Sequence, residues 1–193
     1  MPIFNHEKLG RCLFIHVPKA GGSSISWWLR DSGFDLGKLG AKQMPHPLYV
    51  DYKKWGDFDY KFMVVREPLD RFCSMLRYRQ GATRGGVQNK NINTYAEDTL
   101  NKAIVRGYRE RSTLDGLWKQ HIPPQVDYYC ADVEIFKFKE NFETLQKKLN
   151  LHTTIPRINV SDGEANVNHL SDTTIDRIKE FYKDDYKMFG YET

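Results

Sequence analysis

A lysine, two glycines and two serines follow one another closely near the N-terminus. Lys19 carries a positive charge, and the hydroxyls of Ser23 and Ser24 can donate hydrogen bonds. Gly21 and Gly22 can adopt positive φ and let the backbone approach an anion closely. These residue types in this order predict a site for a phosphate or sulfate group. The alternative is a tight strand–helix connection with a solvated lysine.

The position of the lysine distinguishes this segment from a nucleotide-binding P-loop. In the P-loop motif, GxxxxGK[ST], the lysine follows the glycines and stands at the helix start. Lys19 instead precedes Gly21 and Gly22. This order disfavours a small-molecule or nucleoside kinase, which remains the alternative enzyme.

A second group of candidates begins at Arg66, directly after an apolar run. Its planar guanidinium suits a phosphate, and Ser74 adds a hydroxyl donor. Ser74 lies about two helical turns beyond Arg66, so the two converge only if the chain bends at Glu67 and Pro68. An ion pair of Arg66 with Glu67 or Asp70 is the purely structural alternative.

Strands and helices alternate along the chain, which predicts a three-layer α/β/α fold with a mainly parallel sheet. In such folds, ligands bind at the carboxyl ends of the strands, where Lys19 and Arg66 fall. Polar, glycine-rich stretches at Ser32–Gln43 and Gly81–Asn93 are expected to be loops, the second a mobile loop or lid. Hydrophobic patterns predict strands at Cys12–Val17, Lys61–Val65 and, nearer a sheet edge, Val133–Phe138, and helices at Ser24–Asp31, Leu69–Arg79, Tyr95–Arg109, Phe142–Leu149 and Thr173–Met188.

The composition is that of a soluble globular protein, with 40% hydrophobic and 28% charged residues. A length of 193 residues suits one domain, and we expect residues 1–193 to form it. No apolar run is long enough to span a membrane, and the N-terminus lacks the pattern of a signal peptide. A cytoplasmic location is therefore expected.

The charge and the cysteines exclude two further classes. A net charge of +4 suits an anionic ligand but falls short of the dense basic stripe of a nucleic-acid-binding protein. The cysteines show no CxxC spacing, and no His/Cys/carboxylate cluster has the spacing of a metal site. We expect reduced thiols, with Cys12 and Cys73 in the core, and no metal.

Together, the two anion-binding segments resemble motifs of the sulfotransferases that use 3′-phosphoadenosine 5′-phosphosulfate (PAPS). IHVPKAGGSSI (residues 15–25) looks like their 5′-phosphosulfate loop, especially in the carbohydrate branch of heparan sulfate 2-O and chondroitin types. VVREPLDRFCSMLRY (residues 64–78) is similar to the element that holds the 3′-phosphate. Weaker similarities extend through most of the chain, at Pro124–Gln125, Tyr128–Tyr129, Phe138–Phe142 and Asp184–Tyr191. The chain is shorter than is usual for this family.

The resemblance implies a P-loop-NTPase-like sulfotransferase core that uses PAPS and no metal. The sulfuryl group would pass to a hydroxyl, in this branch on a saccharide. Lys19 would stabilise the leaving oxygen, and His46, in the loop between the two motifs, would be the general base. Glu67 and Glu140 are the alternative bases. The residues expected to bind the cofactor are Lys19, Ala20, Gly21, Gly22, Ser23, Ser24, Arg66, Ser74, Arg157 and Asn159.

Tryptophans could add a stacking surface for adenine or a sugar ring. Trp27 and Trp28 are adjacent in a predicted helix and cannot both face one site, so we expect one of them in the core; Trp55 is the third candidate. A protein that binds adenosine bisphosphate or nucleic acid without catalysis is the alternative from another functional class. Such a protein would keep Arg66 and the glycine loop but would not need His46.

Overall fold

The computed structural model describes residues 2–38, 56–81, 91–106, 121–158 and 163–192. The chain forms two compact units. The first consists of Met1–Arg66 and Asp127–Asn159, and the second of Glu67–Val126 and Val160–Thr193. The polypeptide therefore passes from one unit to the other directly after Arg66, Val126 and Asn159.

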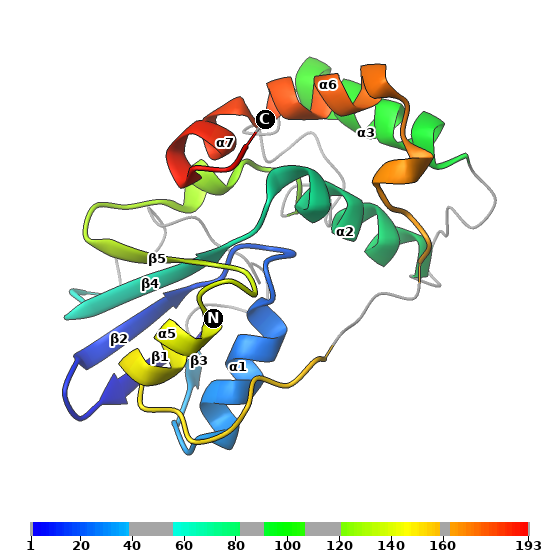
Figure 1. Ribbon diagram of the computed structural model, residues 1–193. Helices are drawn as coiled ribbons and strands as arrows, with labels where there is room; N and C mark the ends of the chain where they lie inside the picture. Colours follow the sequence, from blue (N-terminus) through cyan, green and yellow to red (C-terminus); the bar gives the residue numbers. More distant parts are fainter. Residues whose placement is uncertain (1, 39–55, 82–90, 107–120, 159–162, 193) are drawn as a thin grey trace. The chain divides into compact units, whose positions relative to one another are not determined.

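The first unit contains a five-stranded sheet with the order β3-β1-β2-β4-β5 (Figure 1). β2 pairs in parallel with β4, and β4 with β5, whereas β1 is antiparallel to both of its neighbours. Four of the five strands thus run in one direction, which confirms an α/β fold with a mainly parallel sheet. β5 lies at an edge, as predicted. The strands are β1 (Pro2–His6), β2 (Gly10–Ile15), β3 (Gly37–Lys38), β4 (Tyr60–Val65) and β5 (Val133–Lys137).

Helices α1 (Gly22–Asp31) and α5 (Phe142–Lys148) pack on the same face of this sheet (Figure 1). Their apolar residues meet alternate residues of the strands, because successive side chains in a strand point to opposite faces. On the opposite face of the same strands, Leu13, Ile15, Met63 and Val65 are equally buried. Burial on both sides explains why these two strands are continuous apolar runs. The shared core contains Cys12, Phe14, Ile25, Trp28, Leu29, Phe62, Val64, Phe136, Leu145 and Leu149.

The segment that follows α5 runs along α1 and is tied to it by side-chain hydrogen bonds. Trp28 is buried and donates from Nε1 to the Thr153 carbonyl at 2.6 Å. The Gln146 side chain donates to the carbonyls of Leu151 and Thr153, at 3.1 and 3.2 Å. Trp28 is therefore the core tryptophan of the adjacent pair, whereas Trp27 is 55% exposed.

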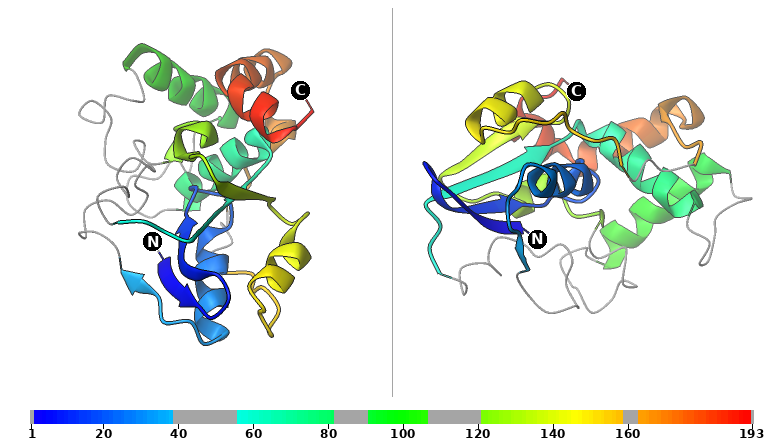
Figure 2. Two further views of the ribbon diagram at one scale, coloured as in Figure 1. Left: turned by 90° about the vertical axis from the view of Figure 1, so that its left-hand side faces the viewer. Right: turned by 90° about the horizontal axis from the view of Figure 1, so that it is seen from below.

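The second unit is helical. α6 packs against both α2 and α3, and their apolar faces share one core with α7 (Figure 2). Cys73 is buried in this core and Cys12 in that of the first unit, as predicted. The helices are α2 (Pro68–Gly81), α3 (Ile92–Arg106), α6 (Asp172–Phe181) and α7 (Lys183–Phe189), with short 3-10 turns at Gln125–Tyr128 and Val167–His169.

Three predictions of secondary structure need amendment. The N-terminal strand β1 and the two-residue β3 were not predicted. The helix expected at Thr173–Met188 is divided into α6 and α7 at Tyr182. The helix expected to start at Tyr95 begins at Ile92, and most of the expected lid, residues 82–90, lies outside the described residues. None of the helices in the described ranges is long and apolar enough to cross a membrane.

Candidate anion-binding site

The N-terminus of α1 carries no negative charge of its own. In the described part of the chain, no side chain caps this helix, and its first turn contains no acidic residue. The amide of Ile25 makes the first helical hydrogen bond, to the Gly21 carbonyl at 3.1 Å. The amides of Gly22, Ser23 and Ser24 therefore point out of the helix end, where the helix dipole favours an anion.

The loop before α1 has an unusual backbone. Lys19 has a φ of 66° and Gly21 a φ of 82°, so both lie in the left-handed region. This conformation costs glycine little but is uncommon for lysine. The backbone thus turns sharply between the end of β2 and the start of α1. This turn brings the lysine to the carboxyl end of the sheet.

Two aromatic rings pack directly against the loop glycines. A Cβ atom on Gly21 would lie 2.5 Å from Cε2 of Phe138, and one on Gly22 would lie 1.8 Å from two ring atoms of His16. The His16 ring also stacks on Phe14, with the ring centroids 5.7 Å apart. Both glycines are therefore required by close packing, and at Gly21 the backbone conformation adds to the requirement.

Arg66 joins the end of β4 to this loop. Its Nη1 donates a hydrogen bond to the Lys19 carbonyl at 3.1 Å, and its Cζ lies 4.8 Å from the centre of the Phe138 ring. Lys139 Nζ lies 5.6 Å from the same ring centre. The structure therefore brings together the two predicted anion-binding segments, and Phe138 is an aromatic surface for Arg66 and Lys139.

A later segment also reaches α1. The Ser24 hydroxyl accepts a hydrogen bond from the Ile158 amide at 3.3 Å and lies 3.5 Å from the Ile158 carbonyl oxygen. Arg157, which precedes Ile158, has an exposed side chain. This late segment therefore lies beside the first turn of α1 in the first unit. Asn159 lies outside the described residues.

A family model for the sulfotransferase family matches residues 4–192. The chain belongs to the sulfotransferase family. The match covers nearly the whole sequence and includes both anion-binding segments. No curated protein and no solved structure matched the chain.

Other residues expected in the sulfotransferase site are less directly tested. Ser74 is buried in α2, in the second unit, so its pairing with Arg66 stays a prediction. His46 and Trp55 lie outside the described residues. Ala20 is buried behind the loop, and Ser23 is half-buried in the first turn of α1. Among the described residues, no group of three His, Cys, Asp or Glu side chains could hold a metal ion.

Glu67, one of the alternative bases, has a structural role. Its two carboxylate oxygens accept hydrogen bonds from the amides of Leu69 and Asp70, at 3.0 and 2.5 Å, which caps the start of α2. The hydroxyl of Tyr186 donates to the same carboxylate at 2.6 Å. These three hydrogen bonds tie the carboxylate to the start of α2 and to α7.

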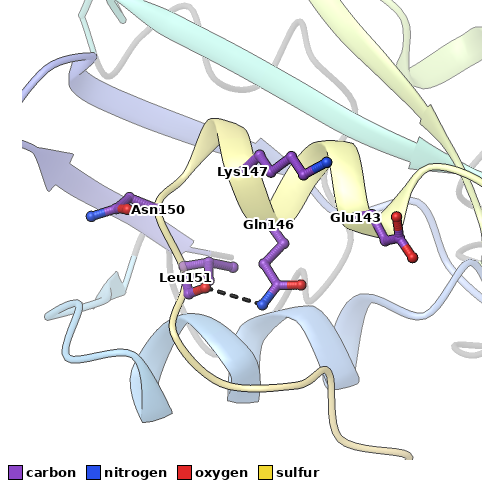
Figure 3. Close-up of a pocket in the computed structure, with 5 residues that line it drawn as sticks. All are labelled: Glu143, Gln146, Lys147, Asn150 and Leu151. Atoms are coloured by element: carbon purple, nitrogen blue, oxygen red, sulfur yellow. Dashed lines mark hydrogen bonds between the residues drawn. The ribbon is translucent and has the colours of Figure 1, made fainter.

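A separate hollow lies beside α5 in the first unit. It has a volume of about 410 Å³ and is lined by Glu143, Gln146, Lys147, Asn150 and Leu151 (Figure 3). None of these is a predicted site residue. Figure 3 shows Gln146 reaching from α5 to the Leu151 backbone, so the hollow lies next to the contact that fixes the chain after α5.

Two residues near the sulfotransferase loop were not predicted from sequence. His16 falls inside the strand expected at Cys12–Val17, but β2 ends at Ile15, and the half-buried His16 ring covers Gly22. Phe138 belongs to a segment with family similarity but had no predicted site role, although it contacts Gly21 and Arg66. Its position at the end of the predicted strand Val133–Phe138 was the available signal, because that places it at the carboxyl end of the sheet, as for Arg66.

Proposed function

We propose that this sulfotransferase transfers a sulfuryl group from PAPS to a hydroxyl group, in a single in-line displacement. The observation that carries the proposal is the unneutralised N-terminus of α1, with Lys19 in the preceding turn and Arg66 bonded to that turn. The sequence similarity of the loop to the carbohydrate branch supports a saccharide as the acceptor.

The residues around this loop suit a phosphosulfate. A Cβ atom at Gly21 or Gly22 would collide with an aromatic ring, so the chain keeps a bare backbone where an anion must approach closely. The backbone amides, Lys19 and Arg66 provide hydrogen-bond donors and positive charges for an anion. The first turn of α1 contains no acidic residue that would compete with it. The amides of Gly22–Ser24 and Lys19 would hold the 5′ end, and Arg66 would hold the 3′-phosphate.

The reaction needs a positive charge at the leaving oxygen and a base at the acceptor. When bound, PAPS supplies the sulfuryl group, and adenosine 3′,5′-bisphosphate is the product that leaves. Lys19 would stabilise the negative charge that develops on the 5′-phosphate. His46 would remove the proton from the acceptor hydroxyl, since histidine titrates near neutral pH. The chemistry assigned to these residues requires no metal.

We further propose that both compact units belong to one sulfotransferase domain, because the family match runs through both of them without interruption. Ser74, Arg157 and Asn159 stay proposed cofactor residues on the basis of the sequence resemblance. The cytoplasmic location also stays a prediction.

Ligand-dependent thermal unfolding tests the cofactor. We expect adenosine 3′,5′-bisphosphate to raise the melting temperature at concentrations where ATP and ADP have little effect, since at a given concentration the ligand that binds the folded state more tightly stabilises it more. Stabilisation by ATP and ADP alone would indicate the kinase instead.

Two substitutions test catalysis. We expect His46→Ala and Lys19→Ala to lower the rate of sulfation by about 100-fold or more. His46→Ala should leave bisphosphate affinity unchanged, because the base contacts the acceptor. Sulfation at the wild-type rate in His46→Ala would exclude this histidine as the base, and binding of the bisphosphate without any sulfation by the wild type would favour the non-catalytic binder.

A further inference from the structure

Helix α7 forms hydrogen bonds next to two of the three places where the chain passes from one compact unit to the other. One passage lies between Arg66 and Glu67, and another between Val126 and Asp127. Adjacent residues of α7, Asp185 and Tyr186, bond to the second-unit side of both passages.

At the first passage, the bonded group is the carboxylate that shapes the turn after Arg66. Glu67 accepts hydrogen bonds from the amides of Leu69 and Asp70 and from the hydroxyl of Tyr186, which is only 2% exposed. The Glu67 carboxylate thus shapes the turn between Arg66 and α2. Tyr186 therefore links α7 to the turn that directly follows Arg66.

At the second passage, Asp185 accepts hydrogen bonds from the amides of Gln125 and Val126, both at 2.9 Å. Asp185 is fully buried. Burial raises the pKa of this carboxyl, while nearby Arg71 and the two amides act in the opposite direction. A buried carboxylate is costly unless it is hydrogen-bonded and paired, which marks this as a specific contact.

We propose that Tyr186 is a positioning residue for Arg66, acting through the carboxylate of Glu67. Arg66 and Glu67 are joined by one peptide bond, so a Glu67 held in one orientation limits the directions in which the Arg66 backbone can present its side chain. This inference rests on the proposed function, in which Arg66 binds the 3′-phosphate of the cofactor. In this proposal Tyr186 acts on Arg66 only through its hydrogen bond to Glu67.

Comparison of two nucleotides tests the inference. Adenosine 3′,5′-bisphosphate carries the 3′-phosphate, and adenosine 5′-phosphate lacks it. We expect Tyr186→Phe to weaken bisphosphate binding by about three- to tenfold, the size of one ordinary hydrogen bond in a protein. Binding of adenosine 5′-phosphate should change by less than about twofold, because this nucleotide has no 3′-phosphate for Arg66 to bind.

Tyr182→Phe is the matched control. Tyr182 is also buried, at the junction of α6 and α7, and its hydroxyl donates to the Ile122 carbonyl at 2.8 Å instead of to Glu67. We expect both variants to lower the melting temperature similarly, but only Tyr186→Phe to reduce the preference for the bisphosphate. In an Arg66→Ala background, Tyr186→Phe should have no further effect on that preference, as expected for residues acting on one interaction.

The outcomes separate the two proposals. A wild-type chain that does not prefer the bisphosphate over adenosine 5′-phosphate overturns the proposed function, and this inference with it. If the wild type has the preference and Arg66→Ala removes it, an unchanged preference in Tyr186→Phe overturns the role of Tyr186 alone.

A second variant covers the case in which Tyr186→Phe does not fold. Glu67→Gln keeps the shape of the side chain but replaces one accepting oxygen with an amide group. It should show the same selective loss of bisphosphate binding. Glu97→Gln, which alters a carboxylate bonded to Thr174 elsewhere in the second unit, should not. Equal nucleotide preferences in these two variants would refute the positioning role.

Discussion

Gly22 and His16 illustrate how closely the anion-binding loop is packed at the level of single residues. Gly22 begins α1, and the ring of His16 occupies the position that its side chain would need. The requirement for glycine here is steric, because Gly22 is not among the residues with positive φ. His16 therefore fixes how near the first helical amides lie to the end of β2.

We predict that Gly22→Ala destabilises the protein by about 1–3 kcal/mol, the usual cost of overpacking, although alanine is the better helix former. It should also weaken bisphosphate binding. Thermal unfolding and ligand titration would measure both effects.

The matched control is Gly37→Ala, whose Cβ would lie 3.5 Å from the nearest atom, the Ile3 carbonyl oxygen, an ordinary contact. Adding His16→Ala to Gly22→Ala should restore part of the stability. Equal melting temperatures for Gly22→Ala and Gly37→Ala would show that the loop tolerates a side chain.

At the residue scale, the sequence was sufficient to predict the types of group but not all of their partners. A positive φ was expected among the glycines and occurs at Gly21, but the left-handed conformation of Lys19 could not be predicted from a residue that disfavours it. The contact of Arg66 with the Lys19 carbonyl and Phe138 depends on residues far apart in sequence. Local patterns do not encode such contacts.

Among the elements, the segment after α5 connects a helix to the anion-binding loop. The side chains of Gln146 and Trp28 donate hydrogen bonds to the Thr153 carbonyl, and the Ser24 hydroxyl accepts one from the Ile158 amide. Contacts along residues 151–158 thus lead from α5 to the first turn of α1. Loosening one end of this segment should affect the other.

We predict that Gln146→Glu lowers stability at pH 7 by about 1 kcal/mol, because a carboxylate cannot donate to the carbonyls of Leu151 and Thr153. Repulsion by these carbonyls favours the protonated form, so the pKa of the new carboxyl is higher folded than unfolded. The variant is therefore closest to wild type below the unfolded pKa, and its deficit grows as the pH rises through the folded pKa.

Denaturant unfolding at pH 4 and pH 7 would measure this difference. Glu143→Gln, on the same helix and lining the same hollow, is the control and should show no such pH dependence. A deficit of equal size at both pH values would contradict the expected repulsion between the new carboxylate and these carbonyls.

The elements on either side of the anion-binding loop were predictable because each has a clear sequence pattern. β2 and β4 are continuous apolar runs, and α1 follows the glycines directly. The hairpin strand β1 was missed because its burial alternates but its residue types do not: Pro2 and His6 are buried, whereas apolar Ile3 is only partly buried. The break at Tyr182 was missed because the apolar pattern continues into α7, where the buried residues are Asp185, Tyr186 and Phe189.

At the scale of the whole molecule, two compact units share one continuous chain, and each unit is assembled from two stretches of sequence. Neither stretch of a unit contains all of its core. The second unit, for example, combines α2 and α3 with α6 and α7 from later in the chain. Such interleaving favours unfolding of both units in one transition.

We predict that Cys12 and Cys73, which report on the first and second units, become reactive at the same denaturant concentration. Both are buried, and burial raises the pKa of the Cys12 thiol to about 12, so neither should react at pH 8 in the native protein. Alkylation followed by mass spectrometry would assign each modified cysteine.

Labelling in fully denatured protein gives the reference rates for both thiols. Two well-separated midpoints would contradict the proposal that residues 1–193 form one domain.

The bonds made by α7 also have a consequence for folding during synthesis. Tyr186 follows Glu67 by 119 residues, and Asp185 follows Gln125 by 60. At translation rates of roughly 5–20 residues per second, the turn after Arg66 is made at least several seconds before the tyrosine that holds it. We therefore expect the nascent chain to become able to bind the nucleotide fully only after α7 has left the ribosome.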